Sequence, residues 1–223
     1  MAKINQIINF TFFLLIILYT NKAMAQFGEE NERLFGAGIT VGTNFTQVDG
    51  DNFAGYHKVG IAAGAILYIN LGTPVALSME LLYAQKGARA GLNQLPKPFN
   101  DKSGFLTDYK IQLNYAEVPI LINYFDQKKN NFGAGFSMSY LGSSKETYRD
   151  GNGAIFEQDA KLFPFKKYDF NFVLNGAAHI WKGLNIGLRF QYSLINVRDL
   201  SNYLTGRQQQ FNNLVSTRLS YIF

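Results

Sequence analysis

From Phe35 onward, apolar and polar residues alternate with a period of two, which is typical of strands whose two faces meet different surroundings. In the first segment Phe35, Ala37 and Ile39 share one face, and small or polar residues occupy the positions between them. Seven further segments repeat the alternation, at about 58–71, 75–87, 109–125, 132–142, 168–180 and 184–197 and in a last segment that ends at Phe223. The pattern predicts eight β-strands and almost no helix.

The connections between these segments alternate between short turns of about three to six residues and long loops of about twelve to twenty-five. Successive connections in a barrel lie at opposite ends, so all the short ones share one end. Bacterial outer-membrane barrels have this pattern, with short periplasmic turns, long outer loops and an even number of strands. We therefore predict an all-β fold, an eight-stranded antiparallel transmembrane up-and-down β-barrel of the OmpA/OmpX size, with both termini in the periplasm.

Alternation alone does not decide which face points outward, because a soluble lipocalin-like barrel has the same period with its apolar face inside. The composition of the polar face favours the membrane barrel. This face is rich in glycine, which suits the narrow interior of eight strands; the glycines are Gly36, Gly38, Gly42, Gly60, Gly64, Gly133, Gly135 and Gly187. Aromatic residues gather near the ends of the apolar face, as in interfacial girdles. We predict that the apolar face contacts lipid.

The fourth segment departs from this pattern in its first half. Gln112 and Asn114 fall on the apolar face if the register is unbroken. We expect either a β-bulge there or a strand that rises beyond the lipid.

Several charged residues fall on the face assigned to the interior. Glu80 and Glu117 lie on neighbouring strands, and Arg189 and Arg218 lie on another neighbouring pair. Buried charges are tolerated when they pair and hydrogen-bond. We predict a lumen charge network of Glu80, Glu117, Arg189 and Arg218 that fills the barrel, with a proton or ion path as the alternative; Lys86 and Asp169 fall on the same face.

The beginning of the chain differs from the rest. Residues 1–25 combine Lys3, an apolar run of about ten residues and the Ala23-Met24-Ala25 sequence, which is typical of a cleaved secretory signal peptide. We predict a short periplasmic segment at 26–33 and the barrel at 34–223. Removal of Lys3 and Lys22 lowers the formal charge from +5 to +3, which indicates no nucleic-acid partner. The sequence contains no cysteine, so neither a lipoprotein anchor nor a disulfide is expected.

Three stretches resemble a known family. They are MELLYAQKGAR at Met79–Arg89, LNYAEVPILINY at Leu113–Tyr124 and the run FNFVLNGAAHIWKGLNIGLRFQYSL. They are similar to the PorT family of Bacteroidota outer-membrane barrels, in which Glu80 and Glu117 match recurrent lumen acids. Ala116 and Asn123 depart from the family pattern, and the final TRLSYIF lacks a usual glycine. The resemblance implies an outer-membrane barrel with a structural or accessory role in the envelope that extends to protein secretion through the type IX system.

Residues able to perform chemistry are scarce. His57 lies beside a loop that contains Asp49 and Asp51, but no nucleophile accompanies it, and His179 has no second histidine or cysteine at ligand spacing. We predict no catalytic residue, no metal site and no cofactor. The expected partners are outer-membrane lipid and envelope or secretion proteins, and the barrel is expected to be monomeric.

Long loops leave one alternative function open. The segments 88–108 and 145–167 carry apolar side chains that either pack together above the barrel or contact a partner; the candidates are Phe99, Phe105, Phe163 and Phe165. The alternative to a structural or accessory barrel is thus a surface binding protein that acts through these loops. A small pore or an enzyme at the barrel rim is the third class.

Overall fold

The computed structural model describes residues 34–51, 53–72, 74–95, 97–99, 104–157, 163–199 and 209–223. The predicted signal peptide at 1–25 and the segment at 26–33 lie outside these residues. The unit described below is Phe35–Phe223. No helix in the described ranges is long and apolar enough to cross a membrane.

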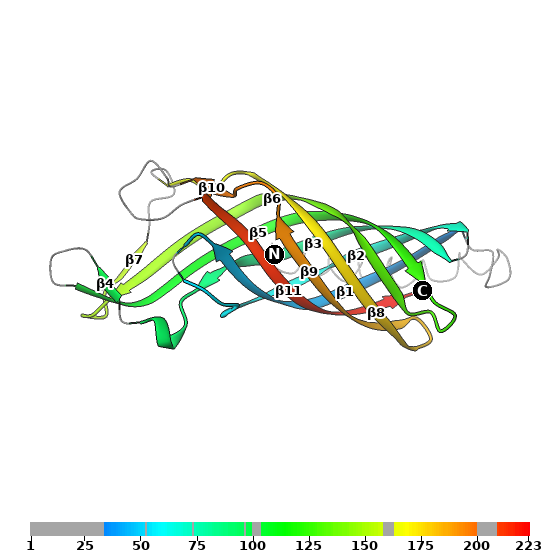
Figure 1. Ribbon diagram of the computed structural model, residues 1–223, viewed down its shortest axis with the longest axis horizontal. Helices are drawn as coiled ribbons and strands as arrows, with labels where there is room; N and C mark the ends of the chain where they lie inside the picture. Colours follow the sequence, from blue (N-terminus) through cyan, green and yellow to red (C-terminus); the bar gives the residue numbers. More distant parts are fainter. Residues whose placement is uncertain are drawn as a thin grey trace, which may run out of the picture. The chain divides into compact units, whose positions relative to one another are not determined.

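Eight long antiparallel strands form a closed ring (Figure 1). They are β1 (Phe35–Asp49), β2 (Lys58–Gly72), β3 (Val75–Arg89), β5 (Gly104–Phe125), β6 (Asn131–Asp150), β8 (Tyr168–Trp181), β9 (Leu184–Ser193) and β11 (Gln209–Ile222). Each pairs with the next, and β1 pairs with β11 from Gly38↔Ile222 to Asp49↔Phe211. This pairing closes the ring, so the predicted eight-stranded up-and-down barrel is confirmed.

Short elements that the alternation did not predict lie between the long strands. They are the 3₁₀ turn η2 (Leu92–Gln94) and the strands β4 (Lys97–Phe99), β7 (Ile155–Glu157) and β10 (Arg198–Asp199). Strand β4 pairs with β5, and β7 pairs with β6. Together β4, β5, β6 and β7 extend the barrel wall as a four-stranded outer sheet at the end opposite the short turns (Figure 1).

The short turns connect β2 to β3, β5 to β6 and β8 to β9. In the β5–β6 turn, the Asp126 carboxylate accepts hydrogen bonds from the side chain of Asn130 and from the backbone N–H groups of Lys128 and Asn130. These bonds, that of the Asn130 side chain foremost, hold the pKa of Asp126 below its usual value. Lys129 takes a left-handed φ of 64°. A single aspartate side chain thus accepts hydrogen bonds from backbone N–H groups of the tight turn.

Between the girdles, the two faces of the wall have the predicted polarity. Outward side chains are apolar and exposed, such as Leu81, Ile122 and Leu188 at 62 to 64%. Inward side chains are polar and buried, such as Ser139 and Asn171 at 0%. Outward aromatic residues lie near the two ends of this apolar band; they are Tyr83, Tyr140 and Tyr168 at one end and Phe35, Tyr124, Phe132, Trp181 and Phe223 at the other.

The polarity of the wall inverts in the outer part of β5. From Ala116 to Tyr124 the outward residues are apolar, whereas Asn114, Gln112 and Lys110 on the same face are polar. The inward residues change in the opposite sense, from Glu117 to the buried Tyr115, Leu113 and Ile111. The register of β5 is unbroken through this change, and the irregularity lies between Leu141 and Ser143 of the partner strand β6. Of the two alternatives for the fourth segment, the strand that rises beyond the apolar band is the one observed, and the bulge lies in its partner β6 and not in β5 itself.

Above this inversion the barrel interior contains a large apolar cluster. Buried members include Ile111, Leu113 and Tyr115 of β5, Leu141 of β6 and Val197. Phe53 stacks on Tyr109 with ring centroids 4.6 Å apart. Here the wall behaves as in a soluble protein, with apolar residues inside and polar residues outside, as expected where water replaces lipid around it.

Candidate functional site in the barrel interior

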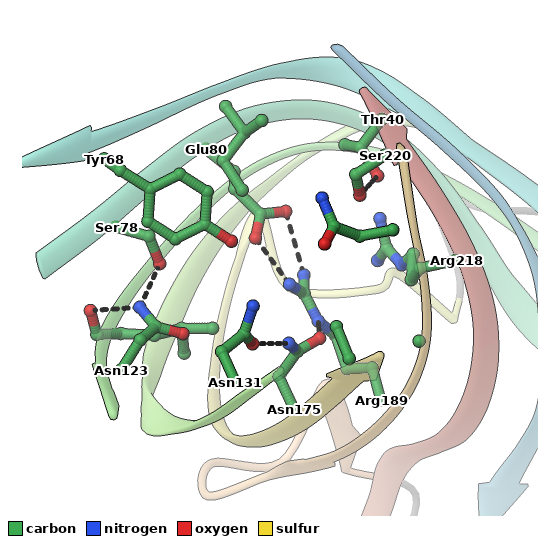
Figure 2. Close-up of a pocket in the computed structure, with 15 residues that line it drawn as sticks. Thr40, Tyr68, Ser78, Glu80, Asn123, Asn131, Asn175, Arg189, Arg218 and Ser220 are labelled. Carbon is green, nitrogen blue, oxygen red and sulfur yellow. Dashed lines mark hydrogen bonds and ion pairs between the residues drawn. The ribbon is translucent and has the colours of Figure 1, made fainter. Parts of the chain in front are cut away.

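Glu80 and Arg189 form an ion pair across the lumen near the end with the short turns (Figure 2). Arg189 Nη1 donates to Glu80 Oε2 at 3.0 Å, and Nη2 donates to the other carboxylate oxygen. Arg189 Nε donates to Asn175 Oδ1 at 3.2 Å. The guanidinium and carboxylate meet through two parallel bonds, the geometry in which such a pair is strongest. Both oxygens of Glu80 are therefore engaged by one arginine.

Lys86 is the centre of a second layer, closer to the outer end. Its Nζ lies 2.9 Å from Glu117 Oε2 and 3.4 Å from Asp169 Oδ2, and its side chain is fully buried. Tyr115 covers the ammonium group, with Nζ 5.1 Å from the ring centroid. Gln191 Nε2 donates to Glu117 Oε1 at 2.8 Å. A single lysine thus serves two carboxylates that point inward from different strands.

Asp169 is held by several donors besides Lys86. Ser193 Oγ donates to Asp169 Oδ1 at 2.7 Å, and Asn212 Nδ2 donates to Oδ2 at 2.9 Å. These contacts join β3, β8, β9 and β11 through one carboxylate. The layer fills the lumen and ties opposite walls together.

A third ion pair lies at the outer end, above the polarity inversion. Arg198 Nη1 donates to Glu146 Oε2 at 2.6 Å, and Tyr109 Oη donates to the other Glu146 oxygen at 2.6 Å. The Phe165 ring lies over the Arg198 guanidinium, 4.0 Å from Cζ to the ring centroid. This contact joins the segment after β7 to β10, so the long loops fold back over the barrel end.

Arg218 differs from the other lumen cations. It is 5% exposed, and its Nε and Nη1 have no hydrogen-bond partner. It forms no ion pair with any residue that the structure describes. Gly42, its partner on β1, leaves room for its stem, because a Cβ at that position would lie 2.8 Å from Arg218 Cδ and 2.3 Å from the Thr217 oxygen.

A small cavity of about 20 Å³ lies beside Arg218. Arg189 and Arg218 both line it, and Glu80 is its acidic residue (Figure 2). The cavity also contacts Asn185 and Ser220, which are half-buried, whereas Arg218 is buried. The cavity thus contains two cationic side chains and one carboxylate that already bonds to one of them.

All four residues of the predicted charge network lie in the interior, and the structure brings Glu80 and Arg189 together. The network differs from the prediction at Glu117, which forms its ion pair with Lys86 and with neither arginine. Lys86 and Asp169 were placed on the interior face without a role in the network. That face has more acids than arginines, and this excess was the signal from which Lys86 could have been assigned as a cation of the network.

The loop phenylalanines have different positions. Phe165, expected as a contact for a partner, is 8% exposed and packs in the apolar cluster, so its exposure is corrected. Phe163 is half-buried, and its carbonyl oxygen accepts a bond from Arg198 Nη1 at 3.4 Å. The side chains of Phe99 and Phe105 lie outside the described part of the chain. Of the two expectations for these side chains, Phe165 follows packing above the barrel and not contact with a partner.

Metal chemistry finds no support among the described residues, where no three His, Asp or Glu side chains are grouped as metal ligands. His57 is exposed and His179 is half-buried. The interior is instead a set of polar and ionic contacts that link opposite walls.

The model of a protein family described as outer membrane protein beta-barrel domain matches residues 24–199. No curated protein matches the chain. One similar solved structure is Ail, the attachment invasion locus protein of Yersinia pestis, in complex with the heparin analogue sucrose octasulfate (8% identity, 86% of this chain and 100% of that chain covered, TM-score 0.48). Another is Neisserial surface protein A (8% identity, 84% and 97% covered, TM-score 0.46).

Proposed function

Because the chain belongs to the outer-membrane β-barrel domain family, and is thus an outer-membrane protein, we propose that it is a closed, non-enzymatic barrel with a structural or accessory role in the envelope. Its task in this proposal is to anchor the outer sheet of β4, β5, β6 and β7 so that the sheet meets a partner protein. The filled interior carries the proposal. A lumen crossed by ion pairs and covered by an apolar cluster suits an anchor better than a pore.

The shape of the wall supports the outer sheet as the working part. Strands β5 and β6 have 22 and 20 residues, more than the 10 to 15 of the other ring strands. The extra length lies above the polarity inversion, where the outward residues include Lys110, Lys145 and Thr147. Long, ordered strands present side chains to a partner at little cost in conformational entropy.

The orientation is part of the proposal. Strand β1 begins and β11 ends at the end where the short turns lie (Figure 1). Short turns are periplasmic in bacterial outer-membrane barrels, so both ends of the barrel domain 34–223 face the periplasm and the outer sheet faces the exterior. An epitope tag placed after Phe223 should be inaccessible to antibody on intact cells, and one placed at the β6–β7 turn should be accessible. The reverse result would overturn this orientation.

Site-specific photo-crosslinking tests the role of the outer sheet. A photoreactive residue at Thr147, on the outward face of β6, is expected to give a discrete protein adduct in living cells. Lys128, in the turn at the other end, is the matched control position. Adducts at Thr147 that contain lipid alone, or the same protein adducts at both positions, would overturn the proposal. Stepwise single-channel conductance in planar bilayers would replace it with a pore.

A secretion role of the PorT type is the second candidate. The motifs Met79–Arg89 and Leu113–Tyr124 support it, because they supply Glu80, Lys86 and Glu117 to the two inner layers of the lumen. In this role the barrel would serve type IX secretion. Deletion of the gene followed by proteomic comparison of secreted proteins tests it. Loss of type IX cargo from the medium, restored by the intact gene, is expected, and an unchanged set of secreted proteins would exclude it.

A further inference from the structure

The cavity beside Arg218 has an uncompensated positive charge. Glu80 is its only acid among the lining residues, and both oxygens of Glu80 bond to Arg189. The two acids of the next layer, Glu117 and Asp169, are engaged by Lys86. Arg218 is thus left without an acid at ion-pair distance in the described residues.

Two of the three guanidinium nitrogens of Arg218 also lack hydrogen-bond acceptors. Its Nε and Nη1 are buried and make no hydrogen bond. A buried donor that has lost water and found no acceptor is costly, and the cost is larger for a charged group. The geometry requires an acceptor in the adjoining space, and a negative charge on that acceptor would also neutralise the guanidinium.

The size of the cavity limits what this acceptor is. About 20 Å³ is available, whereas a single water needs about 10 to 15 Å³ on the same measure. The space suits one monatomic ion or one to two waters, and it is too small for phosphate or an organic acid. The half-buried Asn185 and Ser220 lie on the side of the short turns, which gives a small ion a way in from that end.

We propose that this cavity is a binding site for one small inorganic anion of the halide class, held by Arg218 Nε and Nη1. Among the charged residues that line the cavity, Arg189 and Arg218 face Glu80 alone, and the ion supplies the second negative charge of this lining. The site does not depend on the proposed role of the outer sheet.

Bromide is the probe for a direct test. Crystals of the refolded protein grown without halide are soaked in bromide at a concentration similar to that of chloride in the medium. Diffraction data are then collected at the bromine absorption edge. One anomalous peak within hydrogen-bond distance of Arg218 Nε and Nη1 is expected. Ordered water in the cavity without an anomalous peak would overturn the proposal.

Thermal unfolding in detergent gives a second readout at constant ionic strength, with gluconate, too large for the cavity, replacing chloride. The unfolding midpoint should rise with the logarithm of chloride concentration, as for any ligand that binds only the folded state. Arg218→Gln should remove this dependence, and Lys110→Gln, which removes an outward cation above the apolar band, should retain it. An equal response of all three proteins would show general salt screening and would overturn the site.

The Ala177→Leu variant removes the cavity volume and keeps the charge of Arg218, so it tests the two contributions separately. Ala177 lines the cavity, so a leucine there occupies the space while Arg218 stays in place. This variant should fold, give no bromide peak and lose the chloride dependence. It therefore tests the site even if Arg218→Gln does not refold, and a retained chloride dependence in Ala177→Leu would contradict it.

Discussion

Replacement of Lys86 by methionine should destabilise the barrel more than replacement of either acid that Lys86 serves. Methionine keeps most of the stem and removes the charge. Lys86 lies 2.9 Å from Glu117 and 3.4 Å from Asp169, and all three side chains are 0 to 1% exposed. Its loss leaves two buried carboxylates without their cation. Removing one partner of a buried ion pair costs roughly 3 to 5 kcal/mol, and we expect Lys86→Met to reach at least this range.

Glu117→Gln should cost less, because Lys86 then still pairs with Asp169. The neutral amide keeps a hydrogen-bonding oxygen for Gln191, so the loss should be about 1 to 3 kcal/mol. In the double variant Lys86→Met, Glu117→Gln only the Asp169 carboxylate is left without its cation. Its loss in unfolding free energy should therefore be smaller than the sum of the two single losses, by about 0.5 to 3 kcal/mol.

Denaturant unfolding in lipid vesicles measures these differences. The protein has one tryptophan, Trp181, which is 62% exposed on the lipid side, so its fluorescence reports loss of contact with the membrane. Lys110→Met is the control for loss of a lysine outside the lumen. A Lys86→Met loss no larger than that of Glu117→Gln, or strictly additive losses in the double variant, would refute the assignment of Lys86 as the shared cation.

Three further perturbations test other parts of the structure. Leu188→Arg, on the lipid face at 62% exposure, should cost roughly 2 to 4 kcal/mol, and Gln112→Arg, outward but above the apolar band, clearly less; equal losses in vesicle unfolding would contradict the position of the band. Gly42→Val should cost about 1 to 3 kcal/mol through overpacking against Arg218 and the β11 backbone, and an unchanged midpoint would show that the stem has room. Phe165→Ala should speed protease cleavage of the segment between β7 and β8 on intact cells several-fold by removing the ring over Arg198, and unchanged cleavage would show that this contact does not hold the segment.

The eight strands were predictable because each one separates lipid from a narrow interior, and that separation appears in the sequence as strict alternation. Leu184–Ser193 is the clearest example, with every second residue apolar from Leu184 to Tyr192. The outer halves of β5 and β6 were harder to assign. Alternation continues there with its sense reversed, and Gln112 and Asn114 looked like errors of register. Three-residue strands such as β7 carry too little pattern to be recognised.

The partners within the lumen depended on quantities that alternation does not contain. Glu80 and Glu117 were placed inside correctly, but which cation reaches each depends on strand tilt and stagger around the ring. Those values place Lys86 level with Glu117 and Asp169, and Arg189 level with Glu80. The lack of an acid partner for Arg218 follows from the same geometry and has no signature in the sequence.

The polarity inversion of β5 also limits the thickness of the bilayer core that this part of the wall can match. About eight residue steps separate Ala116 from Tyr124, and about 3.3 Å per step at a tilt of about 40° gives an apolar height of about 20 Å. A bilayer with a core of about 30 Å exceeds this height. Lipid around β5 must therefore thin locally, or Asn114 and Gln112 must enter hydrocarbon. The wall around β5 is thus matched to a locally thin bilayer, and a thicker one would favour association of barrels through this part of the wall, which reduces the length of strained lipid boundary.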